Sequence, residues 1–327
     1  MTWMVSGGAG YIGSHVVRAM VAAGERVVVV DDLSTGDPQR LPDGVHLEKG
    51  SVLDADLLDR VLREHSVDGI VHIAGKKQVA ESVERPLYYY RENVQGLQTL
   101  LEAAVRAGVR SFLFSSSAAV YGMPDVDLVT EETPCAPMSP YGETKLAGEW
   151  MVCAAGAANG IATACLRYFN VAGAATPELG DAGIFNLVPM VFERLSQDKA
   201  PLIFGDDYAT ADGTCVRDFI HVEDIASAHV AAARRLAADP SAALVLNIGR
   251  GEGVSVAEMV GIIGSVTGRA DVAPQTAPRR PGDPARVVAA ATRIQQELGW
   301  TARHDVREMV TSAWAGWCLR HPEPARD

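Results

Sequence analysis

The sequence predicts an α/β fold, with a doubly wound parallel sheet followed by a smaller C-terminal α/β domain. Apolar runs that suit strands alternate with segments of helical apolar spacing through the first half of the 327 residues, which is typical of a parallel sheet covered by helices. Beyond Gly173, proline, glycine and aspartate become more frequent and the apolar runs shorten. We therefore expect one domain over residues 1–171 and a second over 172–327, of which 216–236 can return to the first.

The first elements form a strand, a glycine turn, a helix and a second strand. The apolar run 3–5 precedes Gly7-Gly8-Ala9-Gly10-Tyr11-Ile12-Gly13, residues 15–21 have helical spacing, and the next apolar run, 26–30, leads to Asp31. Glycines let the backbone approach a pyrophosphate, and the helix N-terminus offers it free N–H groups. This unit predicts a dinucleotide-binding domain of the Rossmann type.

Asp31 indicates which dinucleotide is bound. Its carboxylate can accept hydrogen bonds from the adenosine ribose hydroxyls and would repel the additional phosphate of NADP. The residues that follow, Asp32 to Thr35, include no arginine or lysine to hold that phosphate. NAD is therefore the expected cofactor.

The remaining elements of the first domain follow from the same two periodicities. Helical apolar spacing predicts helices, and short apolar runs rich in Val, Ile and Phe predict strands. The expected strands are 45–48, 69–73, 111–115 and 163–168, and the expected helices are 54–64, 86–107 and one that begins at about residue 141.

Composition excludes several classes of partner and location. The formal net charge of −12 at pH 7 argues against nucleic acid and anionic membranes as partners. Five scattered cysteines lack the spacing of a metal or disulfide framework, so we expect reduced thiols in a cytoplasmic protein. The first strand begins at about residue 2, which leaves no room for a signal peptide. The most apolar stretch, 151–166, is too weak for a membrane span.

Candidate catalytic side chains follow two expected strands. Ser115-Ser116-Ser117 ends one strand, and Tyr141 and Lys145 lie four residues apart at a helix start, hence on one face. Open parallel sheets bind ligands at the carboxyl ends of their strands. Because a nearby ammonium favours tyrosinate, we expect Lys145 to lower the pKa of Tyr141, which can then act as a general base toward a substrate hydroxyl. Ser117 is placed to bridge the same oxygen.

With these residues identified, the chain resembles the UDP-glucose 4-epimerases among the extended short-chain dehydrogenase/reductases, over essentially its whole length. The family's catalytic serine, tyrosine and lysine match Ser117, Tyr141 and Lys145. The segments that carry the resemblance are 7–13, 74–82, 93–96, 115–122, 139–145, 167–173, 204–208, 213–221 and 277–283.

The resemblance implies NAD-dependent interconversion of UDP-glucose and UDP-galactose by C4 epimerisation through a 4-keto intermediate. It assigns the first domain to NAD and the second to the UDP-hexose. By matching positions, NAD would be contacted by Gly7, Gly10, Tyr11, Ile12, Gly13, Asp31, Lys77, Asn93, Tyr141 and Lys145. The UDP-sugar would be held by Ser117, Asn170, Asn186, Phe204, Arg217, Arg280, Asp283 and Val287.

Two positions depart from the pattern of the family. Gly50-Ser51 stands where relatives often have an acid that contacts adenine, and Val287 stands where some carry a bulky aromatic that faces the sugar. A valine leaves room beside the C2 substituent of the hexose. The expected substrate range therefore extends to UDP-N-acetylglucosamine.

Two other functions compete with epimerisation. A sugar-nucleotide dehydratase or decarboxylase of this fold carries an acid just after the serine or threonine of the fifth strand, whereas this chain has Ala118 and Ala119, which cannot transfer protons. A non-catalytic NAD-sensing protein would need the glycine turn but not Tyr141, Lys145 and Ser117.

The last two expectations concern metals and assembly. His221 lies near Asp218 and Asp224, but this spacing suits a helix-cap network equally well, and we expect no metal.

Helical apolar spacing over 97–104 and in the helix after Tyr141 predicts a homodimer in which these helices pair, as in the resembling family. The alternative is that both stripes only pack on the sheet.

Overall fold

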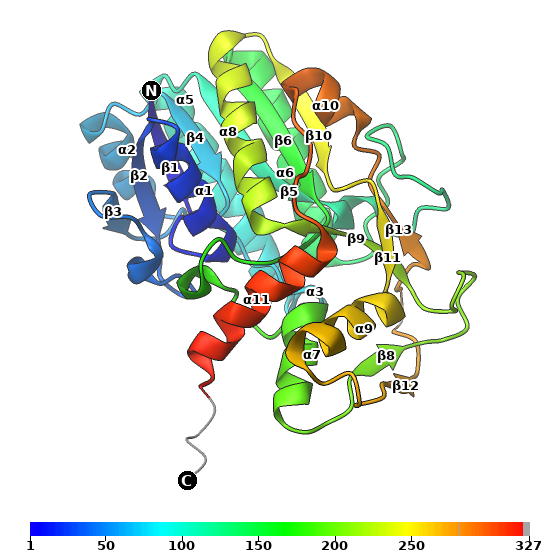
Figure 1. Ribbon diagram of the computed structural model, residues 1–327. Helices are drawn as coiled ribbons and strands as arrows, with labels where there is room; N and C mark the ends of the chain where they lie inside the picture. The colour runs from blue at the N-terminus through cyan, green and yellow to red at the C-terminus, as the bar shows by residue number, and fades with distance from the viewer. Residues whose placement is uncertain (281, 323–327) are drawn as a thin grey trace.

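The protein, described here by a computed structural model for residues 1–280 and 282–322, has a larger and a smaller lobe (Figure 1). The larger lobe is built on a seven-stranded sheet in which all neighbouring strands are parallel. In sheet order the strands are β10 (Ala243–Ile248), β6 (Ala162–Tyr168), β5 (Ser111–Ser117), β4 (Gly69–His72), β1 (Thr2–Ser6), β2 (Arg26–Asp31) and β3 (His46–Lys49).

Helices cover both faces of this sheet, because its strands are apolar on both sides. α1 (Tyr11–Ala22) and α8 (Val222–Ala238) share one buried cluster with the strands. α2 (Ala55–Glu64), α5 (Gly96–Ala107) and α6 (Pro140–Asn159) share the cluster on the opposite face. The predicted doubly wound α/β class is confirmed.

The order of the strands reverses between β1 and β4, which are neighbours in the sheet but not in the sequence. In doubly wound sheets the crevice at such a point, at the carboxyl ends of the strands, receives the ligand. Gly7 follows β1 and Ala74 follows β4, so the glycine turn lies at this crevice.

The long helix expected over 86–107 is present in three consecutive parts. It runs from α4 (Pro86–Tyr89) through a π-helical segment (Tyr90–Gln95) into α5. The apolar side chains of its 97–104 stretch are buried in the core below the sheet, and these are Leu97, Leu100, Leu101 and Ala104. The stripe therefore packs on the sheet, and it is not the part of the helix that could face a second subunit.

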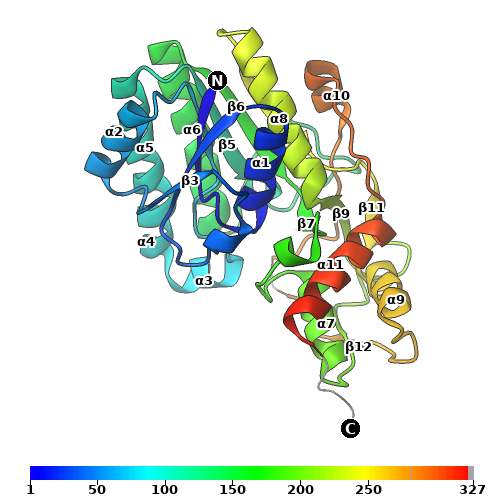
Figure 2. The same cartoon turned by 60° about the vertical axis from the view of Figure 1, so that its left-hand side comes forward.

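Within the described residues, the smaller lobe contains two short sheets and three α-helices around a core of its own (Figure 2). β9 (Val216–His221) is parallel to β7 (Asn170–Ala172) and β13 (Arg286–Val287) and antiparallel to β11 (Gly253–Ser255). The other elements of this lobe are the parallel pair β8 (Leu202–Phe204) and β12 (Gln275–Ala277) and the helices α7 (Leu187–Ser196), α9 (Val256–Thr267) and α11 (Val306–Arg320).

The chain passes between the lobes more than once. After β9, helix α8 packs on the large sheet and β10 adds a strand beside β6, before β11 returns to the smaller lobe. The sequence did not reveal β10 as a strand of the large sheet, because it follows a long excursion through the other lobe. The shorter elements are α3 (Val79–Glu84), α10 (Thr292–Leu298) and the 3₁₀ segments Pro38–Arg40, Ala118–Tyr121 and Pro177–Leu179.

Two remaining sequence-based expectations concern a membrane span and the segment 277–283. Among the helices of residues 1–280 and 282–322, none has the length and apolar character that crossing a membrane requires. Within the expected segment 277–283, Pro281 lies outside the described residues.

Candidate active site

A cavity of about 430 Å³ lies where the strand order reverses. Nine of the ten predicted NAD contacts line it, namely Gly7, Gly10, Tyr11, Ile12, Gly13, Asp31, Lys77, Tyr141 and Lys145. The same cavity thus joins the glycine turn to the two catalytic candidates of α6.

Two glycines of the turn are required by close backbone contacts. Gly7 has a φ of +73°, and a Cβ there would lie 2.7 Å from the amide nitrogen of Ala74. A Cβ on Gly13 would lie 2.0 Å from the carbonyl oxygen of Gly7. α1 begins directly after Gly10, so its free N–H groups lie at the cavity. A turn that has no space for a Cβ, beside a helix N-terminus, fits the pyrophosphate of a dinucleotide.

Asp31 lies on the cavity wall with its carboxylate engaged by the backbone. Oδ2 accepts from the Ala9 amide at 3.0 Å and Oδ1 accepts from the Leu33 amide at 2.9 Å. Burial raises the pKa of Asp31, while these two hydrogen bonds lower it. The carboxylate therefore fixes the turn and the loop after β2 while it lies beside the predicted ribose site.

Asn93 is the predicted NAD contact that does not line the cavity. Its Oδ1 accepts from the Lys76 amide at 2.7 Å, and its Nδ2 donates to the Lys76 carbonyl and to Thr144 Oγ1, both at 3.0 Å. The amide therefore ties the loop after β4 to α6, and its place in the structure is that of a support for the cavity wall.

Sequence reasoning missed two cations that line the cavity. Lys76 Nζ donates to Ser34 Oγ at 3.2 Å, and buried Arg40 donates from Nη2 to the Gly180 carbonyl at 2.9 Å. The position of Lys76 beside Lys77 could have indicated it. No sequence feature near Arg40 indicated its position, because that position is set by the hydrogen bond to Gly180, 140 residues further along the chain.

The three catalytic candidates come together where β5 meets α6. Lys145 Nζ donates to the Ser115 carbonyl at 2.8 Å and lies 5.9 Å from the centre of the Tyr141 ring. Ser117 Oγ accepts from the Ala119 amide at 3.2 Å, at the start of a 3₁₀ turn, and it also hydrogen-bonds Tyr141. Ser139 caps α6 by accepting from the Gly142 amide, which sets where this helix and its tyrosine begin.

The expected lowering of the pKa of Tyr141 is wrong for the protein groups by themselves. Burial raises the pKa of Tyr141, and the hydrogen bond with Ser117 lowers it by less. Burial also lowers the pKa of Lys145, to about 8. Desolvation disfavours both charged forms, and in this enclosed site it outweighs the attraction expected from their spacing.

The predicted UDP-sugar residues other than Ser117 lie on the smaller lobe, and none of them lines the 430 Å³ cavity. Arg217 and Asp283 form an ion pair with each other, and Arg280 stacks on Phe204 with its guanidinium 3.9 Å from the ring centre. Asn170 begins β7 and Asn186 precedes α7, and both are exposed.

Val287 is 9% exposed in β13, beside Arg217 on β9. It packs in a cluster that includes Tyr121, Leu146 and Phe169, with Ala118 at its edge. This cluster connects the smaller lobe to the turn after β5. Val287 therefore lies near Ser117 rather than on the outer surface.

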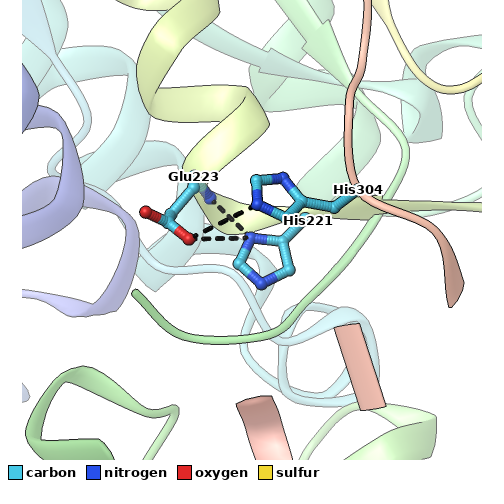
Figure 3. Close-up of side chains that lie close together, drawn as sticks. All are labelled: His221, Glu223 and His304. Carbon is cyan, nitrogen blue, oxygen red and sulfur yellow. Dashed lines mark hydrogen bonds and ion pairs between the residues drawn. The ribbon is translucent and has the colours of Figure 1, made fainter. Parts of the chain in front are cut away.

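His221, Glu223 and His304 lie close together, but the contacts of His221 are those of a helix cap (Figure 3). His221 Nδ1 accepts from the Glu223 amide at 3.0 Å at the start of α8, and Nε2 pairs with Ser312 Oγ at 2.9 Å. The His221 and His304 rings stack 4.2 Å apart, and Glu223 Oε2 lies 3.8 Å from His221 Nδ1 and 3.7 Å from His304 Nε2. Since both nitrogens of His221 are engaged, this cluster is explained as a cap rather than a metal site.

Comparison with known proteins identifies the family. The model of the NAD dependent epimerase/dehydratase family matches residues 3–249. The chain belongs to this family. It is 45% identical over 323 residues to the UDP-glucose 4-epimerase of Azospirillum brasilense, covering 96% of this chain and 91% of that protein. The UDP-glucose 4-epimerase of Halalkalibacterium halodurans is 42% identical, with 98% and 97% covered.

Solved structures agree with this assignment. A UDP-glucose-4-epimerase from Stenotrophomonas maltophila, with bound NAD and formylated UDP-arabinopyranose, superposes with a TM-score of 0.95 at 37% identity and covers 99% of this chain and 100% of its own. The UDP-Glc/GlcNAc 4-epimerase of Campylobacter jejuni gives 0.86 at 36%, with 97% and 99% covered. The resemblance found in the sequence, the fold and NAD as cofactor are confirmed.

Proposed function

We propose that this protein interconverts UDP-glucose and UDP-galactose by epimerisation at C4, with NAD held throughout the cycle. The observation that carries this proposal is the convergence of Tyr141, Lys145 and Ser117 beside the cavity that contains the glycine turn. NAD, when bound, accepts the C4 hydride and later returns it. The cycle is redox neutral, so the cofactor need not be exchanged.

Tyr141 is the proposed proton acceptor for the C4 hydroxyl. Its phenolate takes this proton as C4 becomes a ketone, and returns it when C4 is reduced on its opposite face. Burial raises the pKa of Tyr141. Lys145, with a pKa of about 8, remains largely an ammonium near pH 7, and its charge together with the positive nicotinamide of bound NAD would favour the phenolate. Ser117, which hydrogen-bonds Tyr141, shares the path of the proton.

The smaller lobe would hold the UDP group. Arg217 and Arg280 can bind a diphosphate in an otherwise acidic chain. Arg217 is paired with Asp283, so diphosphate binding requires this guanidinium to share or exchange its carboxylate partner. Asp283, once released, can accept from the uridine ribose. Asn170, Asn186 and Phe204 complete the proposed set.

The proposed substrate range includes UDP-N-acetylglucosamine. Val287 is smaller than an aromatic side chain and leaves room beside C2 of the hexose, and the related Campylobacter jejuni structure is that of a UDP-Glc/GlcNAc 4-epimerase. A bulky side chain at this position would exclude the N-acetyl group by steric clash, and a smaller side chain removes that discrimination. The apolar contact that is lost for UDP-glucose costs only about 1–3 kcal/mol of binding free energy.

The test is to purify the protein without added cofactor, denature it and identify the released nucleotide by chromatography. Approximately stoichiometric NAD is expected, together with conversion of UDP-galactose to UDP-glucose without external NAD. Recovery of NADP, or a strict need for external NAD, would contradict the proposal. NAD binding with no turnover of any UDP-sugar would favour the non-catalytic alternative.

We further propose a homodimer formed through the exposed side of α3, α4 and α6, rather than through the buried 97–104 stripe. Leu87 on α4 is 82% exposed, Trp150 on α6 is 66% exposed, and Val83 on α3 is also exposed. These helices contact one another on the larger lobe (Figure 2). Exposed large apolar residues gathered on one face mark an interaction surface. Light scattering on Trp150→Glu should show a shift toward monomer, and an active wild-type monomer would reject the interface.

A further inference from the structure

A buried ion pair between α6 and β6 has no role in the mechanism above. Arg167 on β6 donates from Nε to Glu149 Oε1 at 2.9 Å and from Nη2 to Oε2 at 2.6 Å. The two side chains are 6% and 4% exposed. Replacing a buried ion pair with apolar residues is often neutral or stabilising, so stability alone gives a weak reason for its presence.

The position of the pair relates it to the catalytic residues. Tyr141, Lys145 and Glu149 follow one another at intervals of four along α6 and share one face. The Ser115 carbonyl accepts from Lys145, and the hydroxyl of the next residue, Ser116, donates to Glu149. Two consecutive residues of β5 are therefore bound to two consecutive turns of α6.

The pair also extends away from the helix. Arg167 Nη1 donates to the Tyr121 hydroxyl at 2.8 Å, and that hydroxyl donates to Asn247 Oδ1 at 2.6 Å. Asn247 Nδ2 in turn donates to the Val129 carbonyl at 2.8 Å. The pair thus holds the carboxyl ends of β5, β6 and β10 and the loop after β5 in one network of buried hydrogen bonds.

We propose that Glu149 is a positioning residue for the reaction. Its carboxylate, fixed by Arg167, holds the end of β5 against α6 and keeps Lys145 charged beside Tyr141. This inference rests on the proposed function, because it assigns Lys145 its role in that reaction.

Electrostatics supports this geometry. Burial lowers the pKa of Lys145 to about 8, and the negative charge of Glu149 acts in the opposite direction. His72 on β4 is neutral, since burial and the Lys145 charge lower its pKa to about 3. Burial raises the pKa values of Tyr89 and Tyr168, so both are neutral as well. The other charged groups around α6 that are not exposed are Glu81 on α3, which accepts from Tyr89, Glu92 in the π-helical segment, and Arg167, paired with Glu149. On the same elements, Glu84, Arg91, Glu102 and Arg106 are exposed.

The test compares the pH profile of kcat/KM for UDP-galactose in the full-length wild type and in Glu149→Gln, which keeps the shape and removes the charge. A single nearby opposite charge shifts a pKa by about one unit or more. In the NAD-bound enzyme the positive nicotinamide favours the Tyr141 phenolate, so the ammonium of Lys145 is the group whose loss limits the reaction and activity falls as pH rises through its pKa. Lowering this pKa moves the alkaline fall to lower pH by about one unit and reduces kcat/KM at pH 8 about fivefold.

Two further variants separate charge from folding. Glu149→Asp retains the negative charge, so the pH at which its kcat/KM declines should lie close to that of the wild type. The double variant Glu149→Gln/Arg167→Met removes the unpaired guanidinium, so its melting temperature should lie closer to that of the wild type than the melting temperature of Glu149→Gln does. Its kcat/KM should still decline at the lower pH expected for Glu149→Gln.

The outcomes distinguish this inference from the proposed function. An active wild type whose pH profile is unchanged in Glu149→Gln overturns the inference alone. A double variant with the wild-type profile also overturns it, since the effect would then arise from the unpaired Arg167. A wild type that converts no UDP-sugar refutes the proposed function itself.

Discussion

Gly13→Ala should release NAD from the protein, because the glycine turn has no space for a methyl group. The new Cβ would lie 2.0 Å from the carbonyl oxygen of Gly7 and 2.8 Å from the Cα of Gly8, whereas real Cβ contacts are essentially never shorter than 3.0 Å. Both neighbours are backbone atoms, so no side chain can rotate away. The turn must open by about 1 Å, the difference between these distances.

Forcing an additional methyl group into a packed site costs about 1–3 kcal/mol, occasionally more. If this cost falls on the NAD-bound form, the affinity for NAD drops by a factor of about 5 to 150. The matched control is Gly261→Ala on α9, where a Cβ would have no atom within 4 Å. There the same substitution should be neutral or stabilise the helix by about 0.4–1 kcal/mol.

The assay measures NAD released per chain after denaturation, together with the melting temperature and the circular dichroism of each variant. Gly13→Ala should contain much less NAD than the wild type, while Gly261→Ala should match it. A Gly13→Ala protein with full NAD content and an unchanged melting temperature would refute the argument that close backbone approach requires this glycine.

Other predictions concern the proposed chemistry. Tyr141→Phe should keep NAD and UDP-sugar binding but lose about 100-fold or more in kcat, since the proton acceptor is gone, while Ser117→Ala should lose less; full activity in Tyr141→Phe would place the base elsewhere. The kcat/KM of the wild type should decline above pH 8, as Lys145 with its pKa of about 8 loses its proton, and a profile flat to pH 10 would contradict that role. Val287→Tyr should lose UDP-N-acetylglucosamine turnover selectively, and equal activity on both sugar pairs in this variant would remove Val287 from the specificity argument.

Local sequence determined the elements that form the predicted dinucleotide site. The glycine turn, the first helix and Asp31 lie within about thirty residues, and their geometry follows from contacts between chain neighbours and adjacent strands. The spacing of Tyr141 and Lys145 placed both on one face for the same reason. Glu149 lies four residues after Lys145, so the spacing also placed it on this face of α6. Its role depends on the ion pair with Arg167 on β6, which the spacing does not reveal.

Tertiary structure decided the features that depend on burial and on distant contacts. Apolar spacing over 97–104 identified a stripe but not its partner, and the structure places it under the sheet. The pKa of Tyr141 is raised rather than lowered, because the desolvation of a side chain is set by everything packed around it and not by its neighbour four residues away. Likewise, Asn93 supports the cavity wall, and Arg40 reaches the cavity through a distant carbonyl. The sequence by itself therefore determined the fold class and indicated the candidate catalytic residues, whereas the charge states and supports of the site arise from long-range packing that no local pattern encodes.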